Sequence, residues 1–165
     1  MAWTSTGATF FIDAFVQAGG CLDWHLQPLL STAGCNFSQR AIVRLENGAT
    51  LRWREEIMLG RHLEEPGRLD LRLDVDIDGA PLLRHQLGVG PGSPGWDGPA
   101  VLGQNRAVGF VLLAGDDEHT ASTACDAWAA MPLDGPGVLL QAVAPDVPAL
   151  REALALADRT RSSPL

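Results

Sequence analysis

The sequence predicts a mainly β fold, made of stacked antiparallel hairpins with one or two short helices near the C-terminus. Apolar and polar residues alternate without a break from Leu69 to Ile77, which is typical of a strand with one buried face. The 18 glycines and 11 prolines indicate many turns between short elements. A Gly-x-x-Leu-x-Trp pattern begins at Gly19 and again at Gly48, and a weaker copy begins at Gly79. The spacings of 29 and 31 residues between these copies predict hairpin units that stack in a row.

Local patterns predict the position of each strand. Runs of β-branched and aromatic residues, or strict alternation, mark the apolar segments. Asn47-Gly48 and Asp78-Gly79 predict hairpin turns, since a type I′ turn needs positive φ at both central residues. Pro28 predicts an edge position, because proline donates no ladder hydrogen bond. The expected strands and extended segments are residues 9–16, 21–26, 27–30, 40–46, 49–55, 69–77, 83–89, 106–114 and 138–144.

The rest of the chain is predicted to hold a long loop, two helices and a tail. Residues 90–103 are too rich in glycine and proline for regular structure, and Trp96 within them is either a partner-binding residue or a plug packed against the domain. A short helix is expected over residues 122–131, and a closing helix is expected after Asp146, its N-cap. We expect residues 161–165 to be a disordered tail. The apolar stripe of the closing helix comprises Val147, Leu150, Leu154 and Ala157.

Composition limits the class of protein. The length and the hydrophobic content of 46% predict one folded domain over residues 1–160. A net charge of −8, with arginine as the only strongly basic residue, argues against a nucleic-acid surface. Cys21, Cys35 and Cys125 have no metal-ligand spacing, which argues against a disulfide framework and a structural zinc site. There is no signal peptide and no apolar run of the roughly 20 residues that span a bilayer, so we expect a cytoplasmic protein without membrane contact.

The stretch from Leu51 to Gly67 combines a strand with a charged turn. Leu51 and Trp53 alternate with arginines, and an acidic, histidine-containing segment follows around Gly60. A glycine between an apolar run and an arginine predicts a bulge or a backbone position that tolerates no side chain. By itself this pattern indicates a strand that runs into a solvated turn. The aspartates between residues 70 and 78 are interpreted as the solvated face of a strand rather than as a metal cluster.

Seven positions of this stretch carry a resemblance to a known family: Trp53, Glu55, Leu59, Gly60, Arg61, Glu65 and Gly67. They resemble the signature of the UreD (also called UreH) urease accessory proteins, where a hydrophobic strand with an acidic residue continues into Leu-Gly-Arg and a further acidic residue and glycine. His62 and residues 64–67 are most similar to actinobacterial members. The likeness covers almost the whole chain, including residues 5–9 and the segment that follows Gly19-Gly20.

The resemblance implies a protein that is not an enzyme. UreD-like proteins are mainly β proteins that bind the urease apoprotein and the accessory protein UreF, which recruits the GTPase UreG. The assembly delivers nickel to urease, so the resemblance implies nickel as a transported ion and no tightly bound cofactor. In agreement with this, the chain has no Gly-x-x-x-x-Gly-Lys-Ser/Thr loop. Met1 falls well inside the sheet of family members, so we expect the first strands of the family to be absent.

Nickel transit requires weak, exchangeable oxygen or imidazole ligands, because tight binding would trap the ion. The candidate ligands are Glu55, His62, Glu64 and Glu65. Alternatively, these residues stabilise the turn by pairing with Arg54 and Arg61. A function from a different class is also open: a non-enzymatic, β-rich binding module unrelated to urease. A hydrolase is disfavoured, because there is no Gly-x-Ser-x-Gly elbow and the histidines (His25, His62, His85 and His119) lie in unrelated contexts.

Overall fold

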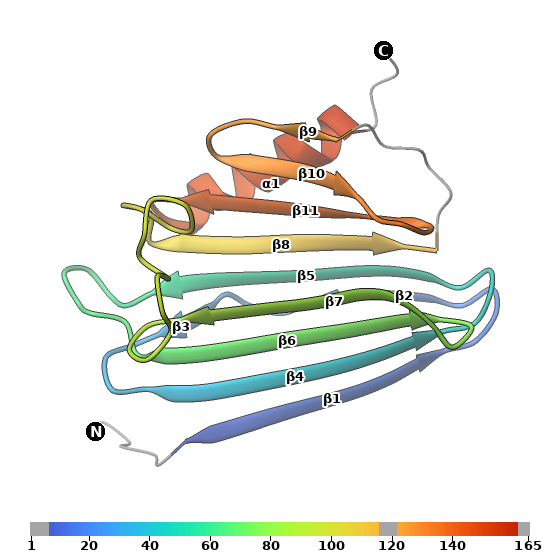
Figure 1. The fold of residues 1–165 in the computed structure, drawn as a ribbon, viewed down its shortest axis with the longest axis horizontal. Coiled ribbons are helices and arrows are strands. Elements are labelled where there is room, and N and C mark those ends of the chain that lie inside the picture. Colours follow the sequence, from blue (N-terminus) through green and yellow to red (C-terminus); the bar gives the residue numbers. More distant parts are fainter. Residues whose placement is uncertain (1–6, 116–121, 162–165) are drawn as a thin grey trace.

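Two β-sheets and one C-terminal helix make up the fold (Figure 1). The computed structural model describes residues 7–115 and 122–161 of the 165-residue chain. The mainly β class predicted from the sequence is confirmed. The elements are β1 (Ala8–Val16), β2 (Cys21–His25), β3 (Leu29–Ser31), β4 (Asn36–Leu45), β5 (Thr50–Leu59), β6 (Arg68–Ile77), β7 (Ala80–Val89), β8 (Ala107–Ala114), β9 (Thr123–Ala124), β10 (Trp128–Pro132), β11 (Gly137–Ala144) and α1 (Val147–Arg161).

The two sheets combine parallel and antiparallel pairs. The first sheet has the order β1-β4-β6-β7, in which β1, β4 and β6 are parallel and β7 returns antiparallel to β6. The second sheet has the order β2-β5-β8-β11-β10-β9, and β3 pairs with β5 beyond the end of β2. Within it, β2 lies parallel to β5, whereas β5, β8, β11 and β10 alternate in direction.

The prediction of stacked antiparallel hairpins is wrong for the first two repeat units. The turn at Asn47-Gly48 takes the chain from β4 in one sheet to β5 in the other, so these strands do not pair with each other. The units do stack, but in parallel. Trp24 lies opposite Trp53 in the β2–β5 register, and their rings stack with centroids 4.9 Å apart and an interplanar angle of 9°.

The third unit folds differently, because its turn has a different backbone. At the β6–β7 connection Asp78 and Gly79 both have positive φ, 48° and 77°, as a type I′ hairpin requires. In the Asn47-Gly48 turn, by contrast, Gly48 has positive φ and Asn47 does not. The hairpin predicted at Asp78-Gly79 is therefore confirmed. It returns β7 to β6 within the first sheet, so this copy of the repeat does not continue the tryptophan stack.

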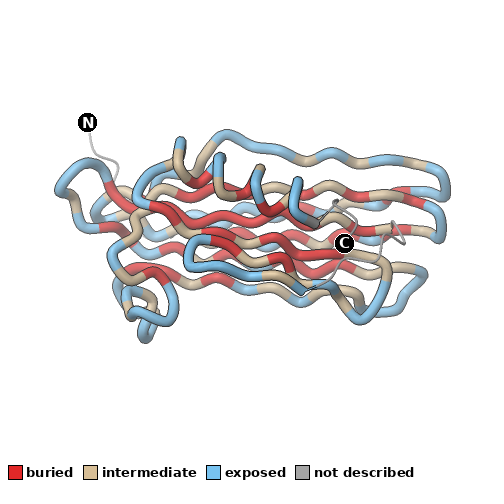
Figure 2. Tube along the Cα trace, turned by 90° about the horizontal axis from the view of Figure 1, so that it is seen from above, coloured by how far each residue is buried: buried red, intermediate tan, exposed pale blue. Residues whose placement is uncertain are grey.

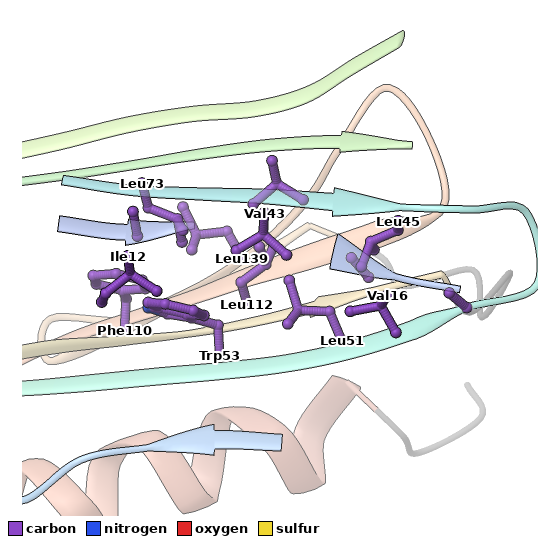
Figure 3. Close-up of a cluster of buried hydrophobic side chains, with 14 residues drawn as sticks. Ile12, Val16, Val43, Leu45, Leu51, Trp53, Leu73, Phe110, Leu112 and Leu139 are labelled. Carbon is purple, nitrogen blue, oxygen red and sulfur yellow. The ribbon is translucent and has the colours of Figure 1, made fainter. Parts of the chain in front are cut away.

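The core forms two layers, one on each side of the second sheet. Between the sheets, apolar side chains from β1, β4, β5, β6, β8 and β11 pack together (Figure 3). On the opposite face, α1 packs against β8, β10 and β11 through Leu150, Leu154 and Ala157, as the predicted stripe required. Asp146 caps the helix, since its Oδ1 accepts a hydrogen bond from the Ala149 N–H at 2.8 Å. Figure 2 shows the buried residues gathered along the inner strands, with exposed residues on the surrounding turns.

The helix expected over residues 122–131 is wrong. This segment forms β9 and β10 at the edge of the second sheet, with Trp128 opposite Ala142. Trp128 and Ala130 are buried while Ala129 and Met131 are half-buried, which is the period of two expected for a strand.

Other predictions fall partly on residues that the structure does not describe. Helix α1 runs to Arg161, and the remainder of the expected tail, residues 162–165, lies outside the described residues. His119 and the start of the segment at residues 5–9 also lie outside them. Within the described ranges, no helix is long and apolar enough to cross a membrane.

Candidate functional site

A buried carboxyl group lies between the two sheets. Glu55 continues the inward face of β5 that begins with Leu51 and Trp53, and only 8% of its surface is exposed. Its Oε1 accepts two hydrogen bonds, from Gln39 Nε2 on β4 at 2.5 Å and from Trp53 Nε1 at 2.9 Å. Neither of these bonds engages Oε2. The carboxyl is therefore anchored through one oxygen, and the other remains for a further ligand.

The protein environment favours the protonated form of this acid. Burial raises the pKa of the Glu55 carboxyl, and the hydrogen bonds from Trp53 and Gln39 offset only part of that effect. A carboxyl with a raised pKa takes up a proton at higher pH than an exposed glutamate. Because a cation and a proton compete for the same oxygens, any cation that bound to the protonated carboxyl would release a proton.

A small cavity of about 60 Å³ adjoins Glu55. Its polar lining residues are Gln27, Gln39, Glu55 and Glu56, and its apolar lining includes Leu29 and Leu71. At this volume the cavity is large enough for a few water molecules at most, since one probe-sized water needs about 10–15 Å³. Pockets that bind organic ligands measure about 300–1,000 Å³, so this cavity is much smaller than such a pocket.

The neighbouring acid, Glu56, has a structural role on the opposite face of β5. Its side chain is fully buried and accepts hydrogen bonds from Arg54 Nε at 2.7 Å and from Arg151 Nε of α1 at 2.9 Å. His25 Nε2 lies 3.7 Å from the same carboxylate. The expected pairing of Arg54 with an acid of this stretch is thus present, but the acid is Glu56. The cluster anchors α1 to the second sheet.

The other three candidate ligands lie apart from Glu55, on the turn that follows β5. His62 and Glu65 are exposed, and Glu64 uses its Oε2 to accept a hydrogen bond from the Arg61 backbone N–H at 2.8 Å. Glu55 precedes the end of this strand by four residues, or about 13 Å of extended chain. Among the described residues, no group of three or more histidine, cysteine or acidic side chains could hold a metal ion together.

The signature glycines are required by close backbone contacts. Gly60 has φ of 68°, and a Cβ there would lie 2.3 Å from the Glu64 carbonyl oxygen. This confirms that the position tolerates no side chain. At Gly67 a Cβ would lie 2.4 Å from the Thr32 carbonyl oxygen, and the Gly67 carbonyl accepts a hydrogen bond from Ser31 Oγ at 3.0 Å.

Arg106 organises the turn that follows β5, although no local sequence pattern predicts this role. Its Nη2 donates hydrogen bonds to the carbonyl oxygens of Leu59 at 2.5 Å, Arg61 at 3.2 Å and Glu64 at 2.5 Å. The side chain of Arg61, in contrast, is exposed. The only sequence signal was an arginine directly before an apolar strand. Nothing in its spacing relates it to a turn more than forty residues earlier.

Trp96 and His85 pack against the core. Trp96 is half-buried and packs against the cluster that contains Val89 and Leu102. The ring of His85 lies against Phe110, with centroids 4.5 Å apart, and burial lowers the pKa of the imidazole. These contacts agree with the interpretation of His85 as a side chain of the sheet.

Comparison with known proteins identifies the family. Residues 4–163 match the family model described as UreD urease accessory protein. The chain is 46% identical over 149 residues to Urease accessory protein UreD 3 of Streptomyces griseus, covering 87% of this chain and 58% of that protein. It is 42% identical over 153 residues to Urease accessory protein UreD of Streptomyces coelicolor, covering 90% and 60% of the two chains.

A third relative, Urease accessory protein UreD 2 of Saccharopolyspora erythraea, is 40% identical over 168 residues, covering 96% of this chain and 59% of that protein. The chain thus spans about three-fifths of the length of the relatives it matches. Over its own length the match extends almost from end to end. The chain belongs to the UreD family of urease accessory proteins.

Proposed function

We propose that this chain acts in the cytoplasm as a non-catalytic scaffold for urease maturation. In this role it binds the urease apoprotein and UreF, and through UreF it meets the GTPase UreG. The observation that carries the proposal is the family match over residues 4–163. The relatives are named as accessory proteins rather than as enzymes, which supports a non-catalytic role.

We propose further that nickel is the cargo and that it passes Glu55 on its way through the protein. The position of the carboxyl supports this, because Glu55 lies between the sheets beside a small cavity and keeps one oxygen outside its hydrogen bonds. A single carboxylate with amide neighbours is a weak, hard donor set that exchanges divalent ions rather than trapping them. His62, Glu64 and Glu65 would serve, in this scheme, at the surface where the ion enters or leaves.

A binding experiment tests the scaffold role. The 165-residue chain, carrying an affinity tag, is incubated with purified UreF and urease apoprotein from the same host, singly and together. We expect both proteins to be retained with the tagged chain at physiological salt. An unrelated tagged β-sandwich domain serves as the control for nonspecific capture. If neither UreF nor urease apoprotein is retained above this control, the scaffold role is wrong for this chain.

A further inference from the structure

Strand β1 is an exposed edge of the first sheet. It pairs with β4 on one side, and no other described strand pairs with it on the other side (Figure 1). The pairing with β4 runs through all nine residues of β1 without a bulge. The unpaired side therefore presents a regular row of backbone N–H and C=O groups that can accept a further strand.

The other strands at the edges of the described sheets carry features that hinder such pairing. β7, at the opposite edge of the first sheet, contains Pro81, and its register with β6 shifts between Val75 and Asp76. In the second sheet, β2, β3 and β9 have only five, three and two residues. Prolines, bulges and short strands are the usual protection of an exposed edge. β1 has none of these, and its one charged residue, Asp13, is paired with Arg44 of its own sheet.

Three phenylalanines of β1 are exposed at this edge. Phe11 and Phe15 lie on the outer face of the sheet, and Phe10 lies on the same face as the core residue Ile12. Among the described residues, three of the eight exposed large apolar side chains thus belong to this one strand. Apolar side chains gathered beside unpaired backbone groups indicate a surface that another strand covers.

We propose that β1 pairs with β1 of a second copy of this chain, so that the two first sheets join into one continuous sheet. The pairing is antiparallel, because a two-fold axis relates the two strands. It uses the exposed β1 edge of both copies at once, so the assembly closes as a dimer rather than growing into a fibre.

The sequence of β1 favours the register centred on Phe11. In this register Phe11 lies opposite the partner's Phe11 on the outer face, and Phe10 lies opposite the partner's Ile12 on the inner face. Asp13 lies opposite the partner's Thr9, whose hydroxyl can donate to the carboxylate. Aromatic and apolar residues are thus paired with each other, as cross-strand pairs in stable sheets are.

The neighbouring registers are less favourable. A centre at Ile12 would place Phe11 against the carboxylate of the partner's Asp13. A centre at Asp13 would place two aspartates directly opposite each other, which destabilises a strand pair. A centre at Phe10 would shorten the overlap from residues 8–14 to residues 8–12.

Sedimentation equilibrium of the 165-residue chain, with no other protein present, tests the dimer. The concentration should reach about 100 μM, because a single strand pair is a small interface of modest affinity. We expect a reversible equilibrium between monomer and dimer. Phe11→Lys removes two phenyl groups and places two ammonium groups opposite each other, so the dissociation constant should rise at least about tenfold.

Two controls separate dimerisation from folding and from general surface effects. Phe11 is exposed in the single copy, so Phe11→Lys should leave the melting temperature unchanged at concentrations where the chain is monomeric. Leu156→Lys makes the same kind of change at an exposed leucine of α1, and it should leave the dissociation constant unchanged. An equimolar mixture of Phe11→Lys and Phe11→Glu should dimerise more tightly than either variant alone, because opposite charges then meet at the axis.

The following results would overturn the inference. The wild-type chain would be monomeric throughout the concentration range, or it would form oligomers that keep growing with concentration. Phe11→Lys would dimerise as tightly as wild type or more tightly, as expected if residue 11 faced the partner's Asp13. The mixture of the two charged variants would dimerise no better than either alone.

Discussion

At the scale of single residues, Glu55 combines two properties that seldom occur together. It continues the inward face of a core strand, and its carboxyl keeps one oxygen outside the hydrogen bonds to Gln39 and Trp53. Burying an acid on an apolar face costs stability unless the acid is protonated or well paired. The buried acid lies beside a cavity. This position supports the proposal that the carboxyl contacts a passing ion.

The raised pKa of Glu55 predicts how stability depends on pH. Since its pKa lies above the ordinary value of 4.5 in the folded state, the stabilisation from protonating Glu55 is present at low pH and is lost as the pH rises through the folded-state pKa. Glu55→Gln is neutral at all pH values and avoids this loss. We expect the urea midpoint of the variant to exceed that of wild type near pH 8 and to approach it near pH 4.5. A constant difference across this range would contradict the assignment.

The role of Arg106 yields a second prediction at this scale. Arg106→Ala removes three hydrogen bonds to backbone carbonyls, so we expect it to lower the free energy of unfolding by about 2–3 kcal/mol. Arg61→Ala is the matched control, because its exposed side chain predicts a change within about 0.5 kcal/mol. Urea denaturation of the two variants checks this. Equal destabilisation by the two substitutions would contradict the assignment of the turn's stability to Arg106 rather than to the signature arginine.

At the scale of elements, the first two repeat units illustrate how far local sequence patterns can be interpreted. Their 29-residue spacing predicts stacking, and the stacked Trp24 and Trp53 confirm it. The direction of pairing could not be predicted, because a turn within one sheet and a turn between two sheets use the same residues. Asn47-Gly48 and Asp78-Gly79 are alike in sequence, but Asp78 has a positive φ and Asn47 does not.

Local sequence patterns likewise predict only part of the candidate site. The inward position of Glu55 follows from the alternation along β5, and the need for glycine at residue 60 follows from its sequence context. The separation of Glu55 from His62, Glu64 and Glu65 depends on where the strand ends, and β5 runs to Leu59 rather than to residue 55 as expected. The contact with Arg106 is long-range, so no local pattern could indicate it.

At the scale of the whole molecule, the second sheet separates two kinds of packing. Toward the first sheet it presents an apolar core and Glu55, and toward α1 it presents a second apolar cluster together with the ion pairs of Glu56. Glu55 and Glu56 are thus adjacent in sequence, but their side chains bond to partners on opposite faces of the sheet. A substitution at Glu55 is therefore expected to leave the attachment of α1 intact.

The overall arrangement also leaves the first sheet with an open edge. Among the described residues β1 pairs only with β4, and Phe11 and Phe15 on this strand are 55% and 57% exposed. Unpaired edges of this kind favour strand addition and self-association. Preparations of the chain used for binding measurements should therefore be monitored for their oligomeric state.

The measurement that tests the central claim most directly is nickel-dependent activation of urease by wild-type chain and by Glu55→Gln. Glutamine keeps the size of the side chain and an oxygen that can accept the bonds from Gln39 and Trp53, but it lacks the carboxylate. Glu152→Gln, which changes an exposed acid on α1, is the control. We predict that Glu55→Gln binds UreF and urease apoprotein like wild type while activating urease at least about tenfold more slowly at limiting nickel, since an amide is a weaker ligand for the ion than a carboxylate. Activation at the wild-type rate by Glu55→Gln would contradict a nickel route past this residue.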